Sequence, residues 1–249
     1  MLLVFLLSSL TASTYTIGKM ILFYSPPIFL IGFRLFIAGI LFLSFYLFSH
    51  HQIPKLTRND YWLLLQVTIF SFFLGFMCEF WALDRMTSAK TAFLGSLSPI
   101  VTALLSYLVF REKMTLRKIL GLALALISLL PSLVASTPDE DKTFLFISTA
   151  ELVLFAAICS FAYGWVVIRK GLRYHTLASS FITGVGMLGG GVAALFTSYV
   201  TEIHPEGFAW WLPVTQVKPF FYLTALLILI GNIICYVLYA YLLKRYTAT

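Results

Sequence analysis

Charged residues are scarce in this sequence. They make up 11% of the 249 residues, whereas 60% are hydrophobic, and the mean hydropathy is +0.94. An average soluble domain has about 25% charged residues, and so few charges cannot give a chain of this size a water-facing surface. The composition therefore excludes an ordinary soluble domain and indicates that the lipid bilayer is the solvent of this protein.

Cysteine is also rare. Cys78, Cys159 and Cys235 lie far apart in apolar stretches without a CxxC pair, so neither a disulfide framework nor a thiolate metal site is indicated. His50 and His51 have no cysteine or second histidine motif nearby, so we expect them in a solvated loop. The sequence thus predicts no metal and no cofactor.

Motifs for nucleotides and nucleic acids are lacking as well. The net charge of +7 is spread between long apolar runs and does not gather on one face, which argues against nucleic acid as a partner. A GxGxxG pattern begins at Gly184, but it lies in the middle of an apolar run and follows no strand, so a dinucleotide site is excluded.

Long apolar runs are what the sequence has instead. A helix that crosses the hydrocarbon core needs about 20 apolar residues. Eight runs qualify, which predicts an all-α integral membrane protein with eight transmembrane helices over residues 2–23, 27–48, 61–83, 89–110, 115–134, 149–168, 176–199 and 219–243. The first run has no basic residue before it, so we interpret it as a membrane helix and not as a secretory signal. Ser148 and Glu151 have the spacing of a capping box, which predicts the start of the sixth helix.

The distribution of basic residues predicts the orientation. If the first helix runs from inside to outside, eleven Lys and Arg lie on one side of the membrane and five on the other. Basic loops stay in the cytoplasm, so both termini are expected there. The longest outer connection, near residues 200–218, contains Trp210 and Trp211, which suit the headgroup level.

Two segments indicate an internal repeat. Residues 80–89 align with residues 239–248, an offset of 159 residues, and both close a long helix with a basic residue followed by a hydroxyl residue and Ala. Five helices separate the two copies, and an odd number inverts the second copy in the membrane. The first copy continues with two more helices, whereas the second stops at Thr249. Either the chain is a fragment of a ten-helix protein or the gene product is this short.

Several motifs, in order along the chain, resemble the EamA repeat of the drug/metabolite transporter superfamily. They are Lys19, Ser25-Pro26, Arg34, Ala38, Thr87-Ser88-Ala89, Leu97-Ser98-Pro99, Glu112 and Gly121. The resemblance gives a first repeat at residues 1–134, an outer connection at 135–148 and a second, incomplete repeat at 149–249. It implies inverted five-helix repeats in the bacterial inner membrane, with a central cavity lined mainly by helices 1, 3, 4, 6, 8 and 9.

Stripes of small and hydroxyl residues predict which helix faces look inward. Ser88, Thr91, Gly95, Ser98, Thr102 and Ser106 form such a stripe on the fourth helix. Pro99 interrupts that stripe, either as a packing kink or as part of substrate binding or gating. The stripes and the ionisable residues give our candidates for substrate binding or gating: Ser13, Thr16, Lys19, Arg34, Glu79, Trp81, Thr91, Ser98, Pro99, Tyr163, Asn232 and Tyr239. The Gly186 to Gly190 spacing in the seventh helix is a GxxxG motif, which predicts tight helix packing.

Ionisable residues within the spans are functional candidates because burying them in lipid costs energy. Arg34, Glu79, Lys19 and Lys90 are all expected in the outer half of the membrane, where they could form one cluster. Such a cluster could hold an anionic group of a substrate. Alternatively, Arg34 and Glu79 form an ion pair that locks helices together.

The leading functional hypothesis is a secondary transporter, an exporter or exchanger of small polar metabolites such as amino acids, working by alternating access. Rings at Tyr15, Trp81, Tyr163 and Trp165 leave room for a nucleoside-type substrate. Some family members resemble S-adenosylmethionine importers of intracellular bacteria, so an S-adenosylmethionine/S-adenosylhomocysteine exchanger is the alternative. An integral-membrane transferase or a channel is disfavoured, because no acid/base pair, nucleophile motif or filter motif is found. The expected partners are a small metabolite and the lipid bilayer, with the chain a monomer or a homodimer.

Overall fold

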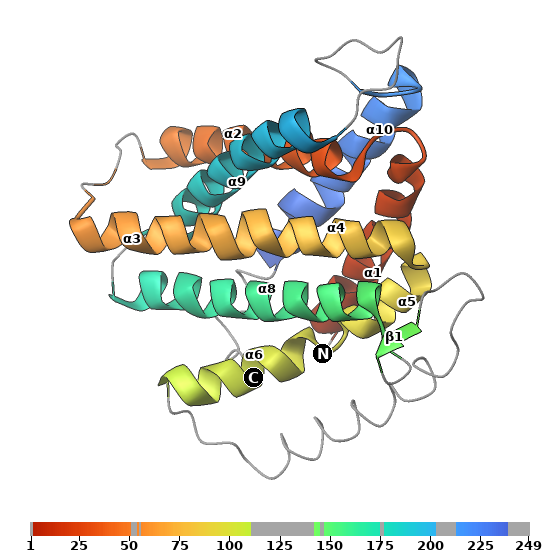
Figure 1. The fold of residues 1–249 in the computed structure, drawn as a ribbon. Coiled ribbons are helices and arrows are strands. Elements are labelled where there is room, and N and C mark those ends of the chain that lie inside the picture. Colours follow the sequence, from red (N-terminus) through yellow and green to blue (C-terminus); the bar gives the residue numbers. More distant parts are fainter. Residues whose placement is uncertain are drawn as a thin grey trace.

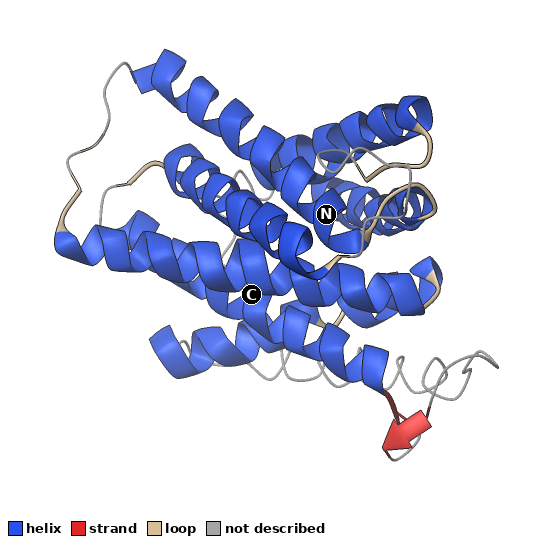
Figure 2. Ribbon diagram, turned by 45° about the horizontal axis from the view of Figure 1, so that its top comes forward, coloured by secondary structure: helices blue, strands red, loops and turns tan. Residues whose placement is uncertain are grey.

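The protein is seen in a computed structural model that describes residues 2–50, 54, 56–110, 142–144, 147–174, 177–202 and 213–238. This part of the chain is almost entirely helical (Figure 1, Figure 2). Its helices are α1 (Leu2–Leu22), α2 (Pro27–His50), α3 (Arg58–Gln66), η1 (Val67–Leu74), α4 (Gly75–Arg85), α5 (Ser88–Gly95), α6 (Ser98–Phe110), α8 (Thr149–Tyr174), α9 (Ser179–Thr201), α10 (Val217–Leu227) and η2 (Ile228–Ile234). Two short strands, β1 (Lys142–Phe144) and β2 (Ile147–Ser148), pair antiparallel just before α8.

Six helical stretches of the described chain are long and apolar enough to cross a membrane: Pro27–Ser49, Arg58–Arg85, Ser88–Val109, Thr149–Leu172, Ser179–Thr201 and Val217–Leu238. Together with α1 they fall on seven of the spans expected from the sequence. The remaining expected span, 115–134, lies outside the described residues, so the count of eight helices stays a prediction. The all-α membrane architecture itself is confirmed.

The helices α2 and α9 pack against each other more closely than side chains would normally allow. A Cβ atom at Gly39 would lie 2.5 Å from the backbone nitrogen of Leu188, and one at Gly191 would lie 2.5 Å from that of Phe36. Phe36 of α2 meets Gly191 of α9, and Gly39 of α2 meets Leu188 of α9. The residue numbers rise along one helix while they fall along the other, so the two helices are antiparallel. Figure 1 shows the two helices side by side. Small residues permit this backbone approach, which replaces the hydrophobic driving force that lipid does not provide.

The predicted GxxxG motif of α9 is a packing site, as expected. Cβ atoms at Gly186 and Gly190 would lie 2.5 and 2.7 Å from atoms of Phe72, a fully buried residue of η1. Phe72 therefore fills the groove that the two glycines leave, and α9 packs on the third span as well as on α2.

Two spans contain a stretch of π-helix, η1 in the third span and η2 in the last described one. In η1 the amide of Gly75 bonds to the carbonyl oxygen of Phe70, which also accepts a hydrogen bond of 2.7 Å from the Ser160 hydroxyl of α8. A π-helical turn contains one more residue than an α-helical turn, and this extra residue changes the direction in which the side chains of the following helix point. Such turns occur frequently at functional sites.

The fourth span is broken where a continuous helix was expected. The structure ends α5 at Gly95 and starts α6 at Ser98, with a turn at residues 96–97 and Pro99 as the second residue of α6. Proline has no amide hydrogen and fits the first turn of a helix, where that donor has no partner in the helix. The predicted span at residues 89–110 is therefore one membrane-spanning stretch built from two shorter helices, and the break lies just before Pro99.

Helix ends are held by charged side chains. The predicted capping box is confirmed: the Ser148 amide donates to Glu151 Oε2 at 2.6 Å, and the Glu151 amide donates to the Ser148 hydroxyl at 3.2 Å. At the start of α2, the carboxylate of Glu202 accepts from the amides of Ile28 at 2.7 Å and Phe29 at 2.9 Å. A carboxylate suits the positive end of the α2 dipole, and this one fixes the end of α9 to it.

We predict that Gly39→Ala destabilises the protein strongly, because the new methyl group would meet the backbone of Leu188. Overpacking of this kind costs about 1–3 kcal/mol or more. The midpoint of thermal unfolding, followed by tryptophan fluorescence in detergent, measures the effect. Gly171→Ala is the matched control, since a Cβ there would meet side-chain ends of Leu63 and Ile182 at 3.1–3.2 Å, which can move. Equal unfolding midpoints for the two variants would contradict the close α2–α9 contact.

Candidate functional site

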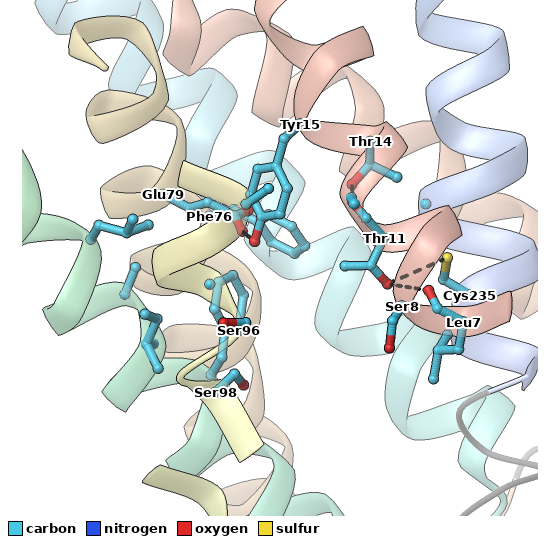
Figure 3. Close-up of a pocket in the computed structure, with 18 of the residues that line it drawn as sticks. Leu7, Ser8, Thr11, Thr14, Tyr15, Phe76, Glu79, Ser96, Ser98 and Cys235 are labelled. Atoms are coloured by element: carbon cyan, nitrogen blue, oxygen red, sulfur yellow. Dashed lines mark hydrogen bonds between the residues drawn. The ribbon is translucent and has the colours of Figure 1, made fainter. Parts of the chain in front are cut away.

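A cavity of about 610 Å³ lies between α1, α2, α4, the α5–α6 junction, α8 and the end of the last described helix (Figure 3). Its size is within the roughly 300–1,000 Å³ typical of sites for small organic ligands. The polar lining consists of Ser8, Thr11, Thr14, Tyr15, Arg34, Glu79, Ser96, Ser98 and Thr102. The aromatic lining consists of Phe76, Phe80, Phe161, Trp165 and Tyr236, together with Tyr15.

Arg34 of α2 is the positive charge of the cavity. Its side chain is buried, with the residue 4% exposed, and the centre of the guanidinium lies 4.6 Å from the ring of Phe76 and 4.8 Å from that of Phe80. Contacts with ring faces stabilise a cation that water cannot reach. Within the described residues the Nε atom of Arg34 has no hydrogen-bond partner. The rings therefore hold the cation in place and leave hydrogen-bonding capacity for an anion.

Glu79 of α4 is the negative charge of the same cavity. The Tyr15 hydroxyl of α1 donates a hydrogen bond of 3.1 Å to Glu79 Oε1, and Figure 3 shows Tyr15 reaching from α1 toward Glu79. Both residues are partly buried. In the described part of the chain Arg34 and Glu79 are the charged residues that line the cavity, and they face it from different helices.

The other two charges expected in this cluster are used elsewhere. Lys19 Nζ donates hydrogen bonds to the carbonyl oxygens of Leu83 at 2.8 Å and Asp84 at 2.6 Å. These carbonyls belong to the last turn of α4, where a cation satisfies oxygens that have no partner in the helix and opposes the negative end of the dipole.

Lys90 forms an ion pair of 2.9 Å with Glu151, and the two side chains are 7% and 4% exposed. The pair joins the first turn of α5 to the first turn of α8, with Glu151 also serving in its capping box. The predicted cluster of four charges is therefore wrong. Lys19 and Lys90 have partners on other helices, far away in the sequence. The period of a single helix does not show such pairings.

Three of the predicted site residues, Arg34, Glu79 and Ser98, line the cavity. Thr91 is fully buried and donates to the Thr87 carbonyl at 3.0 Å. Asn232 is 1% exposed, and its amide contacts the Met187 sulfur at 3.9 Å. Neither of these is part of the cavity lining.

Four rings are candidates for binding a nucleoside-type substrate. Tyr15 and Trp165 line the cavity, whereas Trp81 and Tyr163 lie outside the lining. The Arg85 guanidinium stacks on the Trp81 ring at 3.8 Å, and Tyr163 packs edge-on against Phe70 at 4.9 Å. Tyr239 and the side chain of Pro99 lie outside the described residues.

The face of α1 that lines the cavity differs from the predicted one. Thr11 and Tyr15 line it, whereas Ser13 donates to the Leu10 carbonyl of its own helix at 2.7 Å and Thr16 is exposed. A hydroxyl in a membrane helix can be satisfied by its own backbone and then need not face a neighbour. The four-residue spacing of Thr11 and Tyr15 is a signal that could have identified the cavity face.

The sequence is similar to known transporters. The model of the EamA-like transporter family matches residues 1–133. An S-adenosylmethionine/S-adenosylhomocysteine transporter of Chlamydia trachomatis serovar L2 is 31% identical over 251 residues, which cover 99% of this chain and 74% of that protein. A transporter of the same description from Chlamydia muridarum is 29% identical over 251 residues, with 99% and 76% covered. The uncharacterized transporter YetK of Bacillus subtilis is 24% identical over 73% of this chain and 54% of its own length.

Among solved structures, a chain described as "Crystal structure of protein" superposes with a TM-score of 0.50. It is 14% identical and covers 98% of this chain and 91% of its own. This likeness concerns the fold alone.

We predict that Lys90→Met lowers stability strongly, because it leaves the buried carboxylate of Glu151 without its cation. Removing one partner of a buried ion pair costs about 3–5 kcal/mol. The double variant Lys90→Met/Glu151→Gln should recover part of the loss, and Lys218→Met, at an exposed lysine, should match the wild type in the thermal unfolding midpoint. A double variant no more stable than Lys90→Met would contradict the pairing.

Proposed function

The chain belongs to the EamA-like transporter family, and from this premise we propose that it exchanges S-adenosylmethionine for S-adenosylhomocysteine by alternating access. It is a multi-pass membrane transporter and not an enzyme. The membrane transferase weighed from the sequence is thereby set aside. The similarity to chlamydial transporters over 99% of this chain supports the substrate pair.

One observation carries the proposal: a buried Arg34 and a partly buried Glu79 face one cavity from different helices. Both substrates end in an amino-acid group with a carboxylate and an ammonium. Arg34 can donate to the carboxylate through a planar fork of N–H groups, and Glu79 can accept from the ammonium. Burying a charge in a membrane protein costs free energy, and such charges mark substrate pathways. Binding a ligand with complementary charges is therefore the role that we assign to Arg34 and Glu79.

The remainder of the lining favours a substrate larger than an amino acid. An adenosyl group adds a flat heteroaromatic base and a ribose, and the cavity offers rings and hydroxyls beside the two charges. Free amino acids, the other substrate class expected from the sequence, would occupy the charged residues and leave the rings unused. The substrate panel described below separates the two.

The inverted repeat is part of the proposal, because alternating access needs two halves that move against each other. Two features support it. The π-helical segments begin at Val67 and Ile228, 161 residues apart, close to the offset of 159 in the sequence alignment. The α2–α9 contacts are also reciprocal, with glycines of each helix meeting larger residues of the other. We place the cavity in the bacterial inner membrane with both termini in the cytoplasm, following the bias of basic residues.

The proposal predicts counterflow in proteoliposomes. Vesicles loaded with S-adenosylhomocysteine should take up labelled S-adenosylmethionine, and vesicles loaded with buffer should not. Arg34→Ala should raise the half-saturation concentration about tenfold to a hundredfold, since a charge-assisted hydrogen bond contributes about 1.5–3 kcal/mol. Glu79→Gln should weaken uptake in the same direction.

The matched control is Arg85→Ala, which removes an arginine whose side chain is 48% exposed and lies outside the cavity lining. Its uptake should equal that of the wild type at equal protein yield. Uptake of free amino acids in preference to S-adenosylmethionine would overturn the substrate assignment. Normal half-saturation with reduced protein yield in Arg34→Ala would instead mean that Arg34 locks helices together.

A further inference from the structure

The cavity has a wall of aromatic rings beside its two charges. Phe161 and Trp165 come from α8, where a spacing of four residues puts them on one face, and Tyr236 comes from the helix that follows η2. The rings of Trp165 and Tyr236 have centroids 5.5 Å apart and an angle of 35° between their planes. We refer to Phe161, Trp165 and Tyr236 as the ring wall.

Phe76 connects the ring wall to the charged part of the cavity. Its ring lies 4.6 Å from the Arg34 guanidinium and meets the Phe161 ring edge-on at 5.0 Å. A molecule whose carboxylate reaches Arg34 therefore has its next groups beside the rings. The charged residues and the ring wall can be occupied by two parts of one ligand.

Hydroxyl groups line the cavity together with the rings. Ser96 lies in the turn between α5 and α6, Ser98 is the first residue of α6, and Thr102 lies about one turn further along α6. The Ser96 hydroxyl donates to the Phe93 carbonyl at 2.6 Å, and its oxygen can still accept a hydrogen bond. Figure 3 shows Ser96 and Ser98 close to each other in the cavity lining. A flat base needs ring faces for stacking and polar groups for the nitrogens at its edge. An acyl chain would need neither of these.

We propose that the ring wall is the subsite for the purine base of the transported molecule, and that Trp165 determines specificity for adenosyl compounds. This inference rests on the proposed function, and it divides recognition into two parts. Arg34 and Glu79 recognise the amino-acid end, which methionine also has. The ring wall recognises the base, which adenosine also has.

The test is direct binding to the purified protein in detergent, measured by calorimetry with three probes: S-adenosylhomocysteine, adenosine and methionine. Trp165→Ala should weaken adenosine and S-adenosylhomocysteine about fivefold to a hundredfold, the range for loss of base stacking, and leave methionine unchanged. Arg34→Ala should weaken methionine and leave adenosine unchanged. Trp165→Phe keeps a ring and should restore most of the adenosine affinity.

The control is Trp62→Ala, which removes a tryptophan that is 63% exposed and lies outside the cavity lining. It should bind all three probes like the wild type, and its thermal unfolding midpoint is compared with that of Trp165→Ala to detect misfolding. Lack of adenosine binding by the wild type, or equal losses of methionine and adenosine in Trp165→Ala, would overturn the inference.

Because binding is measured without transport, the two proposals can fail separately. A protein that binds adenosine through Trp165 but shows no counterflow contradicts the proposed function and supports the subsite. Counterflow of S-adenosylmethionine with an unchanged adenosine affinity in Trp165→Ala supports the function and contradicts the subsite.

Discussion

The cost of a charge in hydrocarbon is the constraint on which the structure of this protein depends. Arg34 lies within a membrane span, 4% exposed, and lipid offers it no partner. Two rings, those of Phe76 and Phe80, stabilise it by their faces without neutralising it. The charge therefore lies next to a cavity that also holds the opposite charge of Glu79, which suits the proposed binding and release of an amino-acid group.

The packing of the helices maintains this arrangement. Glycines let α2 approach α9 closely, and the carboxylate of Glu202 fixes the start of α2, the helix that carries Arg34. The π-helical η1 leads directly into α4, which carries Phe76 and Glu79. Lys19 satisfies the last carbonyls of α4, and Lys90 with Glu151 ties α5 to α8. Charged side chains thus have two roles in this protein: some hold helix ends together, and others face the cavity.

The sequence predicts the elements that depend on local patterns. Apolar runs locate the spans, because lipid requires closed helices of a given length, and the spacing of Ser148 and Glu151 locates a helix start, because the cap is formed within one turn. The site is predicted in part. Charge singles out Arg34 and Glu79, but it singles out Lys19 and Lys90 equally, and their partners lie on other helices. The outcome for Ser13 depends on its own backbone. A helical period shows which residues share a face, but the direction of that face is set by packing with distant segments.

The central claim is that Arg34 and Glu79 hold the amino-acid end of an adenosyl substrate. An experimental structure with S-adenosylhomocysteine bound tests it most directly. The account predicts ligand density in this cavity, with the carboxylate within about 3 Å of the Arg34 guanidinium and the ammonium turned toward Glu79. Density for the ligand at another place in the protein, or in this cavity with the carboxylate turned away from Arg34, would contradict it.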